Sequence, residues 1–240
     1  MRIDDQYQMI ALNQLEQFES IYKFGRNEAV GAVEELIAAG GVYGLPTTAD
    51  TVTVTSTSGN DVVGGSGART IHVFGLDVNY LEIDEIIDMN ATSVNEYIRV
   101  FRAHVETSGD LSPTSGANEG TLTISQTGGT DMVLINPNDG QTLCSCYTIP
   151  ANAIGLLWSA DTTVGEGKTS TNRLKVKEFD SNSPFRTKGI RDNFENSVGI
   201  RYKIPRTIPS KADVVFTAIS TAAGTKVSAT FLLQLFKSLG

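Results

Sequence analysis

The sequence contains few of the residues that build most enzyme active sites. Its 240 residues include only two histidines, two cysteines and one tryptophan. A nucleophile triad brings together a Ser or Cys, a His and an orienting acid, and neither His72 nor His104 accompanies a nucleophile-elbow motif. We therefore expect no catalytic residue, no cofactor-binding residue and no metal ligand, and we expect the protein not to be an enzyme.

Cysteine is too scarce for a disulfide framework. Cys144 and Cys146 are two residues apart, so in a strand both side chains point to the same face and a disulfide between them would be strained. No other cysteine could complete a metal site with them. We expect reduced, partly buried thiols that pack as small hydrophobic side chains, which suits assembly in a reducing cytoplasm.

Basic residues are outnumbered, and long apolar runs are absent. The 19 Lys and Arg residues face 27 Asp and Glu residues, for a formal net charge of -8. Nucleic-acid binders need clustered cations, so we expect no nucleic-acid partner. No stretch reaches the length of a membrane span. Residues 1–5 lack the basic start and apolar run of a secretory signal, so we expect no membrane insertion and no export by the general pathway.

What the sequence does contain is period-two alternation, the pattern of strands with one buried and one solvated face. Turn residues recur about every ten positions, as in sandwiches and jelly rolls. The expected fold class is mainly β, with β-sandwich or jelly-roll-like lobes. The predicted strands are Thr51–Thr57, Arg69–Phe74, Leu81–Met89, Tyr97–Glu106, Gly120–Gln126, Asp131–Ile135, Leu143–Ile149, Gly155–Ala160, Arg173–Phe179, Phe185–Lys188, Val198–Ile204, Ala212–Ser220 and Val227–Phe236.

A strong turn signal divides this β region. Pro137–Gly140 reads PNDG, a run of residues that favour turns. We expect a first sandwich lobe over residues 42–140 and a second over residues 141–240. Within the second lobe, the nearly all-apolar Phe231–Phe236 predicts a central strand. Pro205 and Pro209 predict an edge strand or crossing loop between them.

Residues 1–41 differ from the rest and predict a partly helical arm. Asn27 can cap a helix, and Gly40–Gly41 can end it. The apolar residues between them recur at helical spacing: Val30, Val33, Leu36 and Ile37. The arm also carries too many apolar side chains to remain fully exposed to water, and it is too short to form a hydrophobic core of its own. We expect it to attach the protein to a sister subunit or to another protein.

Three motifs suggest chemistry but have simpler explanations. Gly64, Gly65 and Gly67 would need a following helix to cradle a phosphate. A strand is predicted there instead, so we interpret them as a hairpin turn. Paired carboxylates can cleave glycosides or bind Ca²⁺, but alternation favours a solvated strand face for the cluster Glu82, Asp84, Glu85 and Asp88. Asn90-Ala-Thr92 matches a glycosylation acceptor, which means little without a secretion signal.

Several phrases, in order, resemble a family of virion structural proteins of tailed bacteriophages. They cover the chain from about Lys23 onward and lie at Lys23–Asn27 (KFGRN), Gly67–Tyr80 (GARTIHVFGLDVNY), Tyr97–Val105 (YIRVFRAHV), Asn118–Ile124 (NEGTLTI), Cys146–Asn152 (CYTIPAN) and Arg201–Asp213 (RYKIPRTIPSKAD). The resemblance implies a non-catalytic virion protein assembled in the host cytoplasm, and it carries over no site residue.

Three functions remain open from the sequence. The first is a capsid-associated decoration or minor head protein that binds the major capsid protein or other virion proteins as a homo-oligomer, with a trimer as first choice. Exposed strand edges, such as Ile200–Ile208, and the apolar C-terminal strand would supply the subunit interface. The second is a tail, neck or fibre-base adaptor of the same particle. The third is a carbohydrate-binding β-sandwich, against which Trp158 counts because its apolar neighbours predict a core position.

Overall fold

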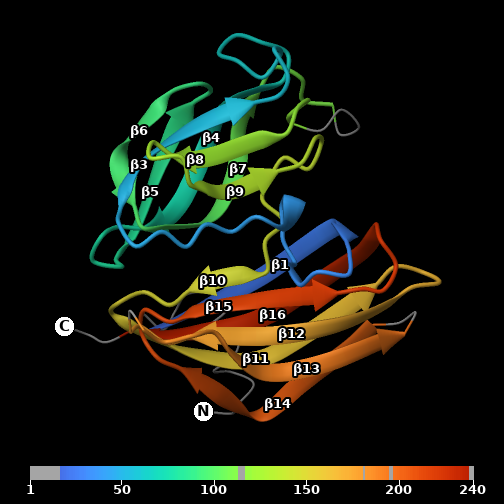
Figure 1. Cartoon of the computed structure of the whole chain (residues 1–240). Helices are drawn as coiled ribbons and strands as arrows, with labels where there is room; N and C mark the ends of the chain where they lie inside the picture. Colours follow the sequence, from blue (N-terminus) through green and yellow to red (C-terminus); the bar gives the residue numbers. More distant parts are fainter. Residues whose placement is uncertain (1–16, 113–116, 181, 195–196, 238–240) are drawn as a thin grey trace, which may run out of the picture.

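The structure, a computed structural model, describes residues 17–112, 117–180, 182–194 and 197–237, and these form two lobes of antiparallel β-sheet (Figure 1). The expectation of a mainly β protein with sandwich-like lobes is confirmed. The strands are β1 (Phe18–Val30), β2 (Glu35–Leu36), β3 (Asp50–Ser56), β4 (Ala68–Leu76), β5 (Glu82–Asp88), β6 (Thr92–Tyr97), β7 (Arg99–Ser108), β8 (Leu122–Gln126), β9 (Asp131–Ile135), β10 (Cys146–Thr148), β11 (Ala153–Val164), β12 (Thr169–Lys177), β13 (Arg186–Phe194), β14 (Ser197–Ile208), β15 (Asp213–Ile219) and β16 (Thr225–Lys237).

The first lobe contains β3 to β9 in two sheets, with strand orders β6-β3-β8-β9 and β5-β4-β7. Alternation decides which side chains these sheets bury. In β3, Val52 and Val54 are fully buried and their threonine neighbours face outward. In β4, Ile71 and Val73 are fully buried, whereas His72 lies on the opposite, outer face. The core therefore lies between the two sheets.

The second lobe pairs the sheet β1-β16-β11-β14 with the sheet β10-β15-β12-β13, and β2 adds to β15. Phe216 of β15 and Phe231 of β16 stack across the interior with ring centroids 5.8 Å apart. Strand β16 lies between β1 and β11, and β14 lies at an edge. The predictions of a central C-terminal strand and a proline-bearing edge strand are both confirmed.

The predicted helix after Asn27 is wrong. The chain from Phe18 to Val30 is a strand, paired antiparallel with β16 from Phe18↔Phe236 to Val30↔Thr225. Asn27 is 2% exposed, and its side chain donates to the carbonyl of Leu36 rather than capping a helix. The pairing joins the two ends of the chain, so a local window cannot reveal it. Residues 1–16 of the expected arm lie outside the described residues.

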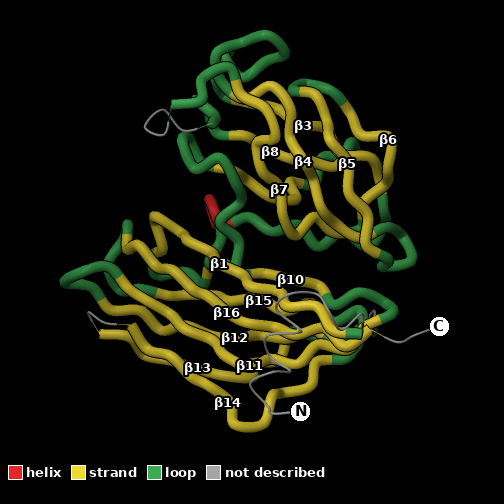
Figure 2. Tube along the Cα trace, turned by 180° about the vertical axis from the view of Figure 1, so that it is seen from behind, coloured by secondary structure: helices red, strands yellow, loops and turns green. Residues whose placement is uncertain are grey.

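Helix is limited, in the described residues, to the 3₁₀ turn η1 (Ala39–Gly41). Gly40 and Gly41 have φ of 59° and 69°, a conformation that glycine adopts without steric cost. The turn, red in Figure 2, lies where the chain passes between the lobes. No helix in the described part of the chain is long and apolar enough to cross a membrane.

Candidate functional site

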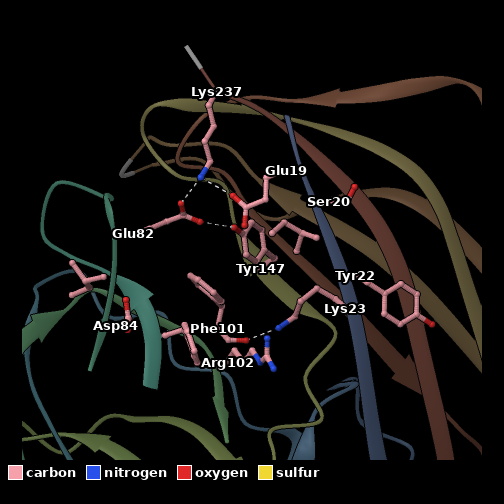
Figure 3. Close-up of a pocket in the computed structure, with 13 residues that line it drawn as sticks. Glu19, Ser20, Tyr22, Lys23, Glu82, Asp84, Phe101, Arg102, Tyr147 and Lys237 are labelled. Atoms are coloured by element: carbon pink, nitrogen blue, oxygen red, sulfur yellow. Dashed lines mark hydrogen bonds and ion pairs between the residues drawn. The ribbon is translucent and has the colours of Figure 1, made fainter. Parts of the chain in front are cut away.

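A cleft of about 410 Å³ lies between the lobes (Figure 3). One wall is formed by β1, β10 and β16 of the second lobe, and the other by β4, β5 and β7 of the first lobe. The lining residues are Glu19, Ser20, Ile21, Tyr22, Lys23, Phe74, Glu82, Ile83, Asp84, Phe101, Arg102, Tyr147 and Lys237. The mixture is polar and aromatic, and it combines segments that are far apart in the sequence.

An ion-pair network bridges one end of the cleft. The ammonium of Lys237 lies 2.6 Å from Glu19 in its own lobe and 2.8 Å from Glu82 in the other (Figure 3). Desolvation acts to lower the pKa of Lys237, but its hydrogen bonds to the two carboxylates outweigh this and raise the pKa. Lys237 therefore stays charged and holds the two lobes together at this point.

Lys23 makes a second bridge deeper in the cleft. It is 8% exposed, and its ammonium donates to the carbonyl oxygen of Phe101. Desolvation lowers the pKa of this lysine. The bond joins β1 to β7, so Lys23 has a structural partner across the cleft.

A third bridge between the lobes is a buried ion pair. Arg99 of β7 reaches Asp213 of β15 through two bonds, Nε to Oδ1 at 2.9 Å and Nη2 to Oδ2 at 3.1 Å, and both side chains are 5% exposed. Desolvation acts to lower the pKa of Arg99, but the bond to Asp213 outweighs it and raises the pKa. Thr148 also donates to Asp213, at 2.6 Å. Nothing in the local sequence around either residue identifies this pair.

A second candidate surface is the outer face of the sheet β1-β16-β11, which carries several exposed apolar side chains. Core residues such as Ile21 and Leu233 alternate with outward-facing neighbours. Tyr22 is 69% exposed, and Phe24, Phe236 and Ile154 are each about 40% exposed. We call this surface the apolar face and define it as Phe18, Tyr22 and Phe24 of β1, Leu232 and Phe236 of β16, and Ile154 and Leu156 of β11.

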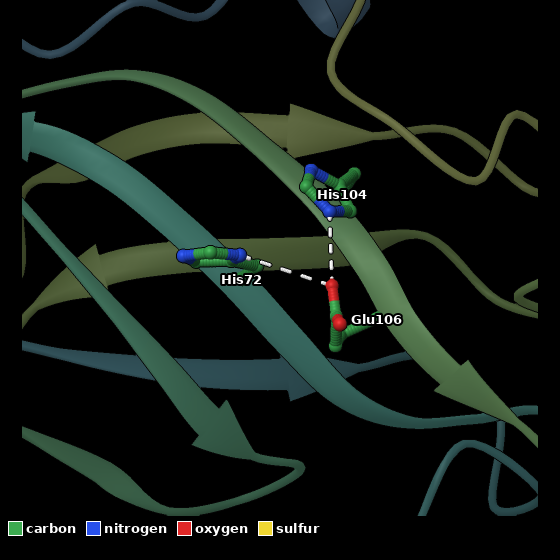
Figure 4. Close-up of side chains that lie close together, drawn as sticks. All are labelled: His72, His104 and Glu106. Atoms are coloured by element: carbon green, nitrogen blue, oxygen red, sulfur yellow. Dashed lines mark hydrogen bonds and ion pairs between the residues drawn. The ribbon is translucent and has the colours of Figure 1, made fainter.

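The two histidines singled out in the sequence lie side by side. His72 of β4 and His104 of β7 are opposite each other in the sheet, and both approach Glu106 (Figure 4). No nucleophile accompanies them in the hydrogen bonds of the described residues. The sequence missed this grouping because 31 residues separate the histidines, although both had been placed in predicted strands.

The acidic residues of β5 have separate environments. Asp84 accepts from His72 at 2.7 Å, and Glu82 lies in the cleft. Glu85 accepts from the backbone N–H groups of Val94 and Asn95 at 2.8 and 2.9 Å. The expected solvated face is confirmed for Glu82, Asp84 and Asp88, whereas Glu85 points the other way and stabilises the start of β6.

The glycine-rich segment is a turn, as expected, but the predicted hairpin is wrong, because the flanking strands β3 and β4 belong to different sheets. Asp61 fills the centre of the turn. That carboxylate is 1% exposed and accepts from the backbone N–H groups of Ala68, Glu119 and Gly120, and from the Ser56 hydroxyl. Within the segment itself, the N–H groups of Gly65 and Gly67 donate to the carbonyl oxygens of Val62 and Asn60, so they are not free to bind a phosphate.

Two further expectations are tested by burial. Cys144 and Cys146 are free thiols, and both are buried. Trp158 is half-buried rather than in the core. It lies where the register of β11 shifts, and its indole N–H donates to Gln234 at 3.2 Å. Because Trp158 follows the buried Leu157, alternation along β11 places its ring on the outer face of the sheet, whereas its apolar neighbours had suggested a core position.

Comparisons with known proteins give no family. No family model matches the chain, and no curated protein matches it. Among solved structures, the infectious bursal disease virus VP2 subviral particle has 9% identity over 96% of this chain and 78% of that chain, with a TM-score of 0.23. The structure of the Gx strain of infectious bursal disease virus has 10% identity over 93% of this chain and 71% of that chain, with a TM-score of 0.22. A Cry1Da tryptic core variant of Bacillus thuringiensis has 7% identity over 88% of this chain and 53% of that chain, with a TM-score of 0.18. At these TM-scores the likenesses carry no argument about fold or function.

Proposed function

We propose that this protein is a non-catalytic structural component of a virion, a decoration or minor head protein that binds the capsid shell of a tailed bacteriophage as a homo-oligomer. The apolar face is the observation that carries the proposal. The ordered phrases that resemble tailed-phage virion proteins supply its biological setting.

The apolar face is suited to binding another protein. Contiguous exposed apolar surface on a soluble protein marks an interaction site, whereas scattered apolar residues do not. Here the exposed side chains lie on three adjacent strands, and Phe18 packs on Phe236 with ring centroids 5.2 Å apart. A rigid sheet presents such a surface at little entropic cost, which favours binding to a repeated lattice of identical sites.

Self-association has its own candidate surface at β14. This edge strand spans Ser197–Ile208 and pairs with β11 on one side. Its Ile204 is 83% exposed. An exposed edge with an apolar side chain invites pairing with another chain, so β14 supports the homo-oligomer, for which we retain a trimer as first choice.

The test compares particle binding by two variants. The double variant Tyr22→Ser/Phe24→Ser removes the two exposed aromatic side chains that β1 contributes to the middle of the apolar face. Val94→Ser is the matched control, because Val94 is 88% exposed on β6 of the other lobe. Removing these two rings, which would be partly buried when the protein binds the shell, should cost about 2 kcal/mol of binding free energy, or about thirtyfold in affinity. Each variant is added to virions assembled without this protein, and bound copies are counted by quantitative mass spectrometry.

We expect on the order of hundreds of wild-type copies per particle, because a decoration protein occupies repeated sites. The double variant should bind far less than wild type, and the control equally well. A dozen copies or fewer would favour the neck, tail or fibre-base role instead. Binding unaffected by Tyr22→Ser/Phe24→Ser would rule out the apolar face as the attachment surface. A stable monomer by light scattering at micromolar concentration would contradict the homo-oligomer.

A further inference from the structure

The outer face of the first lobe brings together the only two histidines of the sequence. His72 and His104 occupy paired positions on the antiparallel strands β4 and β7. Opposite side chains on one sheet face lie close enough to share a ligand. Glu106 lies two residues beyond His104 and therefore on the same face. All three side chains point toward a common point (Figure 4).

The distances fit a transition metal ion. Glu106 Oε2 lies 3.1 Å from His104 Nε2 and 3.8 Å from His72 Nδ1, and the three ligand atoms lie within 4.8 Å of one another. A tetrahedral zinc ion with bonds of about 2.1 Å separates its ligand atoms by about 3.4 Å. Small side-chain rotations would bring the three atoms to that spacing.

Asp84 supplies the outer support that metal-binding histidines usually have. Its Oδ2 lies 2.7 Å from His72 Nε2, the ring nitrogen that faces away from Glu106. A carboxylate there holds the proton on Nε2, which leaves the lone pair of Nδ1 directed at the metal position. His72 is also stacked on Phe74 with ring centroids 4.0 Å apart, which fixes its plane.

His104 is held less firmly. Its Nδ1 is buried and has no hydrogen-bond partner in the described part of the chain. Its Nε2 interacts with Glu106. The ring therefore has one ordered polar contact, and that contact is with another member of the cluster.

Charge complementarity favours a divalent cation. Glu106 and Asp84 together contribute two negative charges, which neutral imidazoles do not offset. Arg102 is not a member of the cluster: its guanidinium lies over the Phe74 ring, 5.4 Å from the ring centroid. Two imidazoles and one carboxylate suit zinc, whereas Ca²⁺ and Mg²⁺ prefer all-oxygen sites.

We propose that His72, His104 and Glu106 bind one Zn²⁺ ion, with Asp84 orienting His72, so that the metal ties β4 to β7. This departs from the expectation of no metal ligand drawn from the sequence. It is independent of the proposed virion role, because it concerns the first lobe alone. Binding to the native state would stabilise the protein by mass action.

The experiment uses untagged, chelator-treated full-length protein titrated with Zn²⁺ by calorimetry. Thermal unfolding is followed with and without the metal. We expect one ion per chain and a rise in melting temperature. Glu106→Gln keeps the side-chain shape and removes the charged ligand, so it should weaken binding at least tenfold even if a histidine variant folds poorly. Asp84→Asn should weaken binding about tenfold, the usual effect of losing such support.

Asp88→Asn is the matched control, because Asp88 is an exposed carboxylate on the same face of β5, outside the cluster. It should bind Zn²⁺ like wild type. Co²⁺ substitution should give the visible absorption bands of a tetrahedral site in wild type and not in Glu106→Gln. No zinc-dependent rise in melting temperature, or equal affinity in wild type and Glu106→Gln, would overturn the proposal.

Discussion

Asp61 shows how one side chain can organise several segments. Its carboxylate joins the glycine-rich turn to the chain before β8 by accepting four hydrogen bonds. Gly67 is required beside it, because a Cβ there would lie 2.1 Å from the Asp61 carboxylate. Burial acts to raise the pKa of Asp61, but the hydrogen bonds from Ser56 and the backbone outweigh it and hold the pKa below its usual value.

Asp61→Asn should therefore destabilise the protein by about 2–3 kcal/mol at pH 7, since the amide nitrogen cannot accept the bonds that the carboxylate oxygen accepts. A carboxylate with a lowered folded pKa stabilises the fold above its unfolded pKa of about 3.9 and loses this contribution as pH falls through the folded pKa. The free-energy difference between wild type and variant should thus be constant near neutrality and shrink below about pH 4. Urea unfolding at several pH values measures it.

The exposed Asp88→Asn serves as the comparison for that series and should change stability by less than about 0.5 kcal/mol. If the gap between wild type and Asp61→Asn stayed constant down to pH 2, the Asp61 carboxylate would not be the source of the stability. The sequence identified the turn from its glycines. It gave no sign of Asp61, because the partners at Glu119 and Gly120 are nearly sixty residues away.

Among the secondary-structure elements, β1 is the one whose type the local sequence pattern predicted wrongly. Most strands after Thr51 were predictable because alternation is a local property, and Asp131–Ile135 agrees to the residue with β9. Strand β1 instead depends on β16 and on a close approach at Gly25. A Cβ on Gly25 would lie 2.1 Å from the Ser145 nitrogen and 2.3 Å from the Ile37 oxygen. That glycine has a packing reason that only the three-dimensional contacts reveal.

Deletion of residues 1–27 should prevent the second lobe from folding. It removes the β1 residues that pair with β16 from Phe236 to Val227 and leaves that apolar strand at an open edge. We expect insoluble protein or loss of the cooperative unfolding transition, measured by circular dichroism and sedimentation. Deletion of residues 1–16 is the control, since it keeps β1 whole, and should leave a soluble, folded protein. Soluble, cooperatively unfolding protein after the longer deletion would show that β1 is dispensable.

For the whole molecule, the buried pair Arg99–Asp213 decides how the lobes are joined. Each partner comes from a different lobe, and Arg99 also donates to the carbonyl oxygens of Pro46 and Ile98 at 2.8 and 2.7 Å. Removing one partner of such a pair leaves an uncompensated buried charge, which is more costly than losing both. The sequence predicted two lobes, but relations between lobes depend on side chains over a hundred residues apart.

Arg99→Met should therefore destabilise the protein by about 3–5 kcal/mol, and the double variant Arg99→Met/Asp213→Leu by less than the sum of its single variants. Denaturant unfolding of wild type, the two single variants and the double variant gives the four stabilities of a double-mutant cycle. Arg26→Met breaks an exposed ion pair with Glu28 and should cost at most about 1 kcal/mol. Strictly additive effects of the two buried substitutions would show that the pair is not energetically coupled.

The pairing of β1 with β16 also constrains how the protein can fold while it is being synthesised. Val30 pairs with Thr225, so about 195 residues must be added before the partner exists. At about 5–20 residues per second, a ribosome takes about 10–40 s over that distance. Strands β3 to β9 all emerge within this interval and can complete their two sheets with one another. The nascent chain thus carries all the strands of the first lobe and an unpaired β1, and the second lobe can close only after β16 has been made.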